Sequence, residues 1–145
     1  MRHYRIYLIE EQFAKHYFGR EKMLLQLFVD YEHANSARKQ LLKKQIEYIT
    51  QPIPTLTIHK LLVKQLHNQN DNNSHRKVHS ILLPDNKSYA KLVVYEEYMQ
   101  LTAEGSYEAE AVFFEIIRKF DPCFLAMDLQ LDRYGWLKPV KMNAF

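Results

Sequence analysis

The spacing of apolar residues changes twice along this chain, and that change limits the folds it can adopt. Residues 3–9 carry aromatic and β-branched side chains in both alternating sets, which predicts a strand covered on both faces and therefore central in a sheet. Apolar positions then recur every three or four residues up to residue 66, as in amphipathic helices. From residue 78 the two-residue period of strands resumes. This order predicts an α+β fold, in which several helices pack on a mainly antiparallel sheet.

Turn and cap residues divide these regions into separate elements. Gly19, Pro52 and the polar loop 68–73 interrupt the helical spacing, and Ser36 is a suitable N-cap, so we expect four helices before the meander of strands. A further helix, an apolar strand and a turn-rich segment at 133–136 should follow. The predicted helices are 10–18, 20–35, 37–50, 57–66 and 107–120, and the predicted strands are 3–9, 78–83, 90–95, 98–103 and 123–129.

Length and composition fit one globular domain spanning residues 1–145. Of the 145 residues 47% are hydrophobic, which is enough for a core without a disulfide or a structural metal. The single cysteine, Cys123, excludes an intramolecular disulfide and is expected as a small buried residue at the start of an apolar strand. No run of about 18 apolar residues occurs, so we expect neither a membrane span nor a signal peptide and predict a cytoplasmic protein.

The sequence lacks the motifs of catalysis and cofactor binding. Only three glycines occur, which leaves no glycine-rich loop for phosphate, and no Gly-x-Ser-x-Gly motif presents a nucleophile. His75 and His79 lie at the start of a predicted strand, where a spacing of four residues separates them by ~13 Å, too far for one metal ion. We therefore expect no metal, no cofactor and no enzymatic activity.

The two parts of the chain differ in charge. Residues 1–80 contain 13 basic and 7 acidic residues, whereas residues 81–145 contain 7 basic and 10 acidic residues. The net charge of +3 is too small to indicate a nucleic-acid-binding protein by itself. The basic first part still leaves an alternative function as a nucleic-acid-binding regulator. Its affinity would fall about 10³-fold between 50 and 200 mM salt for six phosphate contacts.

The predicted third helix has a polar residue in the middle of its apolar face. Helical geometry places Gln45 near the centre of an arc of five apolar side chains, which are Leu41, Leu42, Ile46, Tyr48 and Ile49. Either Gln45 is buried with its amide hydrogen-bonded, or part of the arc is exposed and Gln45 recognises a partner. The sequence leaves both possibilities open.

The predicted first helix poses a similar question. Its apolar residues Phe13, Ala14, Tyr17 and Phe18 spread over about 140° of the helix, wider than one contact with a sheet requires. Aromatic residues four positions apart can fill a core, or they can anchor an interface because they give much contact area for little lost rotamer entropy. Both interpretations remain open at this point.

Several long blocks of the sequence occur in the order found in one protein family. Among them are HYFGRE at 16–21, KQIEYITQPIP at 44–54, PCFLAMD at 122–128 and RYGWL at 133–137, with shorter blocks at 2–4, 7–9, 13–14, 107–110, 113–115 and 139–140. In these blocks the chain resembles SirA, the sporulation inhibitor of replication. Residues 60–105 resemble the family only weakly.

The resemblance implies a cytosolic inhibitor from endospore-forming bacteria that performs no catalysis. Its implied partner is the N-terminal domain of the replication initiator DnaA, whose function at the chromosomal origin it would block during sporulation. It implies neither a direct nucleic-acid contact nor a membrane or small-molecule partner. The family's binding surface corresponds here to Phe13, Tyr17, Gln45 and Pro139, which favours the interface interpretation of both helices.

Overall fold

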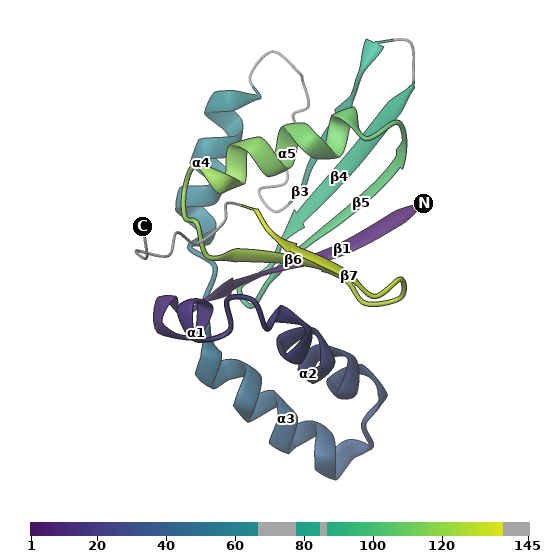
Figure 1. Ribbon diagram of the computed structural model, residues 1–145. Helices are drawn as coiled ribbons and strands as arrows, with labels where there is room; N and C mark the ends of the chain where they lie inside the picture. Colours follow the sequence, from purple (N-terminus) through teal and green to yellow (C-terminus); the bar gives the residue numbers. More distant parts are fainter. Residues whose placement is uncertain (67–77, 85–86, 138–145) are drawn as a thin grey trace.

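The computed structural model describes residues 1–66, 78–84 and 87–137 (Figure 1). In these residues the chain forms five helices and one antiparallel sheet of seven strands, which confirms the predicted α+β class. The strands are β1 Arg2–Ile9, β2 Thr50–Gln51, β3 Val78–Leu82, β4 Ser88–Val94, β5 Met99–Gly105, β6 Phe124–Asp128 and β7 Arg133–Trp136. The helices are α1 Glu11–His16, α2 Glu21–His33, α3 Ser36–Ile49, α4 Thr55–Gln65 and α5 Glu108–Arg118. The predicted polar loop 68–73 lies outside the described residues.

Strand β1 lies at the centre of the sheet, as its composition predicts. The strand order is β3-β4-β5-β1-β6-β7, and the short β2 pairs with the end of β1. β1 pairs with β5 from Arg2 to Ile6 and with β6 from Arg5 to Leu8. Residues 6–9 of this strand are buried. The expected meander of β3, β4 and β5 is also confirmed.

Alternate residues of β1 face two different layers of helices. The ring of Tyr4 contacts that of Phe114 in α5 edge to face, with the centroids 5.4 Å apart. Tyr7 points to the opposite face, where its ring centroid lies 4.4 Å from that of Phe28 in α2. Successive side chains of a strand point to opposite faces. The sheet therefore separates an α4–α5 layer from an α1–α3 layer formed by α1, α2 and α3, as Figure 1 shows.

The α4–α5 layer combines apolar packing with one buried charge. Helix α5 buries Phe113 and Ile117 completely against the sheet. Glu110 of the same helix is 2% exposed, and its carboxylate accepts hydrogen bonds from the Arg2 guanidinium (Nε to Oε1, 2.8 Å) and from the Tyr4 hydroxyl. A buried carboxylate needs such partners because it has lost its hydration. Packing and a polar contact together join α5 to the central strand.

Three local predictions are wrong, each for a physical reason. Residues 133–136 form β7 rather than a turn because their backbone pairs with β6. Asn35, not Ser36, is the N-cap of α3, since its side chain accepts a hydrogen bond of 3.0 Å from the Arg38 amide. Thr50 does not continue the helix but pairs with Ile9 in the short β1–β2 ladder.

Candidate protein-binding surface

Helix α3 carries two parallel stripes of side chains with opposite exposure. Leu42, Ile46 and Ile49 form the buried stripe. The neighbouring stripe consists of Leu41, which is 57% exposed, Gln45, which is exposed, and Tyr48, which is 71% exposed. Each stripe has the four- and three-residue spacing of one helix face. The apolar arc of this helix is therefore only half used for folding.

This arrangement rules out one of the two interpretations of Gln45. The side chain is not buried in the core, so the first alternative, a buried amide with internal partners, is wrong. The arc is partly exposed, as the second alternative required. Gln45 stands between two exposed apolar residues of the same stripe, Leu41 and Tyr48. An amide there has both a donor and an acceptor available to another molecule.

Helix α1 adds aromatic side chains to this stripe. Ala14 is buried beneath the helix, while Phe13 and Tyr17 are partly buried and pack against the core. The ring of Phe13 meets that of Tyr48 at 61°, with centroids 5.3 Å apart. This edge-to-face pair brings α1 and α3 together at the surface. Tyr17 follows Phe13 by four residues, and its ring contacts that of His16, with 4.8 Å between the centroids.

Backbone hydrogen bonds fix the position of α1 relative to the end of α3. The Glu10 amide, just before α1, donates to the Ile49 carbonyl at 2.8 Å. The next residue of the chain, Thr50, pairs with Ile9 in the sheet, and its hydroxyl donates to the Ile46 carbonyl at 2.8 Å. The Phe13–Tyr48 contact is thus held by rigid backbone on both sides. A surface fixed in this way loses little conformational entropy when it binds.

We define the α1–α3 surface as Phe13, Tyr17, Leu41, Gln45 and Tyr48. The family resemblance implied three of its members as binding residues, and the sequence pattern assigned the other two, Leu41 and Tyr48, only to an apolar arc. The width of that arc was the signal that could have identified them, because a helix packed on one side cannot bury so broad a face. The fourth predicted residue, Pro139, lies outside the described residues.

The chemistry of the α1–α3 surface suits a protein partner more than the phosphate backbone of a nucleic acid. Rings and an aliphatic side chain supply contact area, and the amide and hydroxyl groups supply hydrogen bonds. None of its five members carries a positive charge. Of the basic residues on α3, Lys39 has its ammonium 5.0 Å from the ring centroid of Tyr31, on the side of α2.

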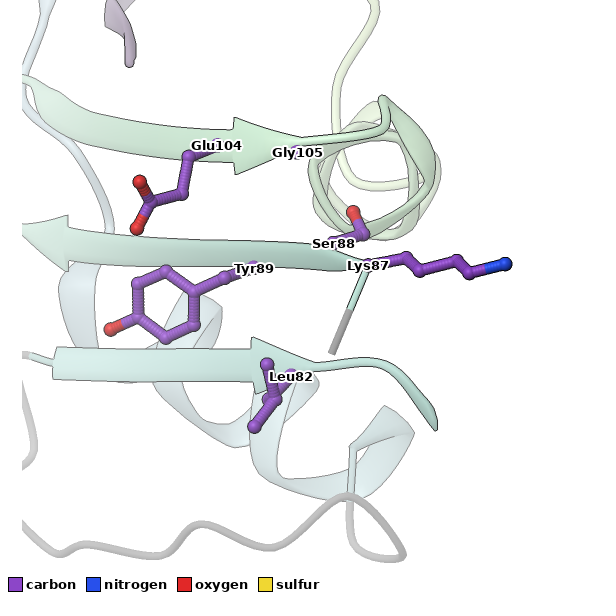
Figure 2. Close-up of a pocket in the computed structure, with 6 residues that line it drawn as sticks. All are labelled: Leu82, Lys87, Ser88, Tyr89, Glu104 and Gly105. Carbon is purple, nitrogen blue, oxygen red and sulfur yellow. The ribbon is translucent and has the colours of Figure 1, made fainter. Parts of the chain in front are cut away.

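A separate hollow lies over the ends of β3, β4 and β5. Figure 2 shows Leu82, Tyr89 and Glu104 side by side on this open face, while Ser88 points toward α5. The Ser88 hydroxyl donates to the Ser106 carbonyl at 2.7 Å and accepts from the Ala109 amide at 2.8 Å. These bonds hold the start of α5, so the serine has a structural role here and does not face the hollow as a nucleophile.

Two further side chains considered for chemistry, Cys123 and His79, are buried or paired. Cys123 is buried, as predicted, and burial together with the Asp121 carboxylate raises the pKa of its thiol to about 11. His79 does not stand alone, since its Nε2 lies 3.3 Å from Nδ1 of His59 on α4. Within residues 1–66, 78–84 and 87–137, no three ligand-type side chains come close enough to hold a metal ion. Among the helices of the same ranges, none has both the length and the hydrophobicity of a membrane span.

Comparison with known proteins identifies the family. The profile described as "Sporulation inhibitor of replication protein SirA" matches residues 2–141. A Bacillus subtilis (strain 168) protein of the same description is 49% identical over 147 residues, which cover 99% of this chain and 98% of that protein. The chain belongs to the SirA family. This confirms the resemblance read from the sequence blocks, and the match extends through every element of the α1–α3 surface and through Pro139.

SirA membership bears on the α1–α3 surface in a specific way. The family description is that of an inhibitor of replication, and it names no catalysed reaction. Phe13 lies on α1 and Tyr17 is the C-cap of that helix. Gln45 lies on the same α3 stripe as Tyr48, whose ring contacts Phe13. The fold therefore brings Phe13 against the stripe that contains Gln45, and Tyr17 follows four residues later at the end of α1. Their role in binding a partner remains a prediction.

Proposed function

We propose that this SirA-family protein inhibits the initiation of chromosome replication during sporulation by binding the N-terminal domain of DnaA through the α1–α3 surface. It acts in the cytoplasm as a binding protein and not as an enzyme. The single observation that carries the proposal is the exposed stripe of Leu41, Gln45 and Tyr48, joined to α1 by the Phe13–Tyr48 contact.

The surface has the composition of a binding hot spot. Tyr48 and Tyr17 offer large rings with few rotatable bonds, so binding immobilises little that was free before. Gln45 lies between apolar neighbours, where contact with a partner would remove water from around its amide. A desolvated amide needs a hydrogen-bonding partner, so Gln45 contributes specificity while the rings contribute most of the affinity.

Occupation of the initiator domain explains inhibition without chemistry. A standard protein interface covers about 800 Å² of each partner. On a small domain this area excludes other proteins from the same face. The bound initiator would then be unable to make the contacts it uses at the origin.

Titration calorimetry of the purified chain against the isolated N-terminal domain of its host's DnaA tests the proposal. We expect saturable binding, and a loss of more than ~2 kcal/mol of binding free energy for Tyr17→Ala and Tyr48→Ala. Because Phe13 and Tyr17 also pack against the core, their replacement lowers stability as well. Gln45→Ala and Tyr48→Ala are therefore the more decisive variants.

Tyr107→Ala is the matched control. Tyr107 is 61% exposed, comparable to Tyr48, but it precedes α5 in the other helical layer. Its replacement should leave binding unchanged. Equal weakening by Tyr48→Ala and Tyr107→Ala would contradict the proposed surface. No binding by the folded, unsubstituted chain would contradict the proposed partner.

The basic first part of the chain makes a nucleic-acid-binding regulator the alternative. Titration with origin DNA in a salt series separates the two functions. Tight DNA binding that falls about 10³-fold between 50 and 200 mM salt would contradict the proposal and favour the alternative.

A further inference from the structure

Glu21 occupies a junction between three parts of the chain. It is the first residue of α2, immediately after the turn that follows α1. One oxygen of its carboxylate, Oε2, accepts a hydrogen bond of 3.0 Å from the Gly19 amide and another of 2.9 Å from Nε1 of Trp136 in β7. We call Gly19, Glu21 and Trp136 the Glu21 junction. A single carboxylate thereby joins segments more than a hundred residues apart in sequence.

The junction is electrostatically favourable. The amide groups at the start of α2 favour a negative charge in the first helical turn. Burial acts to raise the pKa of Glu21, but the hydrogen bonds from Gly19, Trp136 and its own amide outweigh burial and leave the pKa below its ordinary value. The group is therefore a carboxylate, and hydrogen bonds to a charged acceptor are stronger than those between neutral groups.

On one side, the junction holds the turn after Tyr17. Gly19 has a φ of 85°, a left-handed conformation that favours glycine. The turn is closed by the Arg20 amide, which donates to the Tyr17 carbonyl at 2.7 Å. Glu21 binds the Gly19 amide within that turn, so it restrains the backbone that carries Tyr17 at the end of α1.

On the other side, the junction holds the last described strand. Trp136 is partly buried against the core, and the next residue, Leu137, donates its amide to the Phe124 carbonyl at 2.9 Å. In the sequence, Trp136 precedes Pro139 by three residues. The carboxylate thus joins the turn that follows Tyr17 to the end of β7.

We propose that Glu21 is a positioning residue for partner binding, which fixes the end of α1 and the end of β7 relative to each other through the Gly19 and Trp136 hydrogen bonds. This inference rests on the proposed function, because it assigns Glu21 to the surface through which the partner binds. Glu21 itself need not touch the partner.

Trp136 provides a direct readout, since it is the single tryptophan of the chain. Its fluorescence reports the indole environment without any partner. Glu21→Ala should shift the emission maximum and raise the acrylamide quenching of the folded protein, because the indole loses its acceptor. Glu21→Gln retains a neutral carbonyl oxygen in the same place and should restore most of the wild-type signal.

Glu108→Ala is the matched control for the fluorescence and binding measurements. Glu108 is also the first residue of a helix, α5, but it is exposed and its carboxylate accepts only a 3.3 Å hydrogen bond from the Ser106 hydroxyl. Its replacement removes the same helix-terminal charge without touching Trp136. We expect neither the emission nor partner binding to change.

The binding arm uses calorimetry with the DnaA N-terminal domain, with circular dichroism to confirm that each variant is folded. We expect Glu21→Ala to weaken binding about tenfold, which corresponds to 1.4 kcal/mol, and Glu21→Gln to weaken it less. Trp136→Phe, which removes the indole N–H and keeps an aromatic ring, should weaken binding to a similar extent. It replaces Glu21→Ala in the binding measurement if that variant does not fold.

The possible outcomes separate the two proposals. Unchanged fluorescence in folded Glu21→Ala overturns the junction itself. A changed emission with wild-type binding overturns the positioning role and leaves the proposed function intact. If the unsubstituted chain does not bind the initiator domain, the proposed function fails and the positioning role fails with it, while the fluorescence still decides whether the junction exists.

Discussion

The two helical layers pack on opposite faces of the same central strand, yet one helix from each layer, α5 and α3, treats its apolar and charged residues differently. In the α4–α5 layer, α5 buries Phe113 completely and even brings a carboxylate, Glu110, into the interior. In the α1–α3 layer, α3 leaves Leu41 and Tyr48 largely in water although apolar side chains favour burial. Only the first arrangement is explained by folding. The exposed stripe of α3 belongs to the surface through which we propose that a partner binds.

The largest expected effect tests the burial side of this comparison. Phe113→Ala should lower the free energy of unfolding by about 4 kcal/mol, because it leaves a cavity among fully buried neighbours. Phe13→Ala should cost about half as much, since that ring is already partly exposed. Urea unfolding followed by circular dichroism measures both. Equal losses would show that α1 is as much a part of the core as α5.

The buried carboxylate should give the next largest effect. Glu110→Ala leaves the Arg2 guanidinium without its principal acceptor and the Tyr4 hydroxyl without its partner, and we expect a loss of about 3 kcal/mol. Glu115→Ala is the control on the same helix, because its pair with Arg118 is exposed and should contribute less than about 0.5 kcal/mol. Similar unfolding midpoints for the two variants would contradict the importance of burial.

Two tyrosines of β1, one facing each helical layer, predict a loss of stability at alkaline pH. Burial raises the pKa of Tyr7 to about 12, and burial with the hydrogen bond to Glu110 raises the pKa of Tyr4 to about 12. The folded chain keeps both protons above pH 10, where the unfolded chain loses them, so this contribution is complete below pH 10 and is lost between pH 10 and 12.

Stability measured by urea unfolding from pH 8 to 12 tests this expectation. In the double variant Tyr4→Phe/Tyr7→Phe, the free energy of unfolding should fall less steeply above pH 10. The two single variants show how much of the alkaline loss comes from each face of β1. If the double variant loses as much stability at alkaline pH as the wild type, the loss comes from other groups.

The smallest expected effect belongs to the exposed stripe. Leu41→Ser should change the free energy of unfolding by less than about 0.5 kcal/mol, because the side chain is 57% exposed and its apolar surface is already hydrated. Leu42→Ser, one position along the same helix, places a hydroxyl at a buried site and should cost several times more. Comparable losses of unfolding free energy at the two positions would contradict the division of α3 into a buried and an exposed stripe.

Most of the fold could be predicted from the sequence because its elements follow their own local patterns. The central position of β1 followed from apolar residues in both alternating sets, and α2, α4 and α5 from helical spacing. β7 could not be predicted this way, since Arg133 to Trp136 includes a glycine and becomes a strand only by pairing with β6. The N-cap of α3 was ambiguous because Asn35 and Ser36 are adjacent and equally suitable.

The candidate site was less accessible from sequence. Helical spacing correctly placed Gln45 within an apolar arc, but it could not show which side of the arc would pack, because that depends on where α2 lies. The exposure of Tyr48 and its contact with Phe13 also require the three-dimensional arrangement of α1 and α3. The family resemblance selected three residues of that surface without indicating their neighbours.

The central position of β1 has a consequence for synthesis on the ribosome. β1 is synthesised before both of its main neighbours, since Arg2 pairs with Ala103 and Leu8 pairs with Phe124. The helices within residues 11–65 can form locally while the central strand is not yet paired with either of these neighbours. Such distant pairings slow folding and leave an apolar strand open to other chains in the interval. The rate at which β5 and β6 are synthesised after β1 therefore sets how long the nascent protein is vulnerable to aggregation.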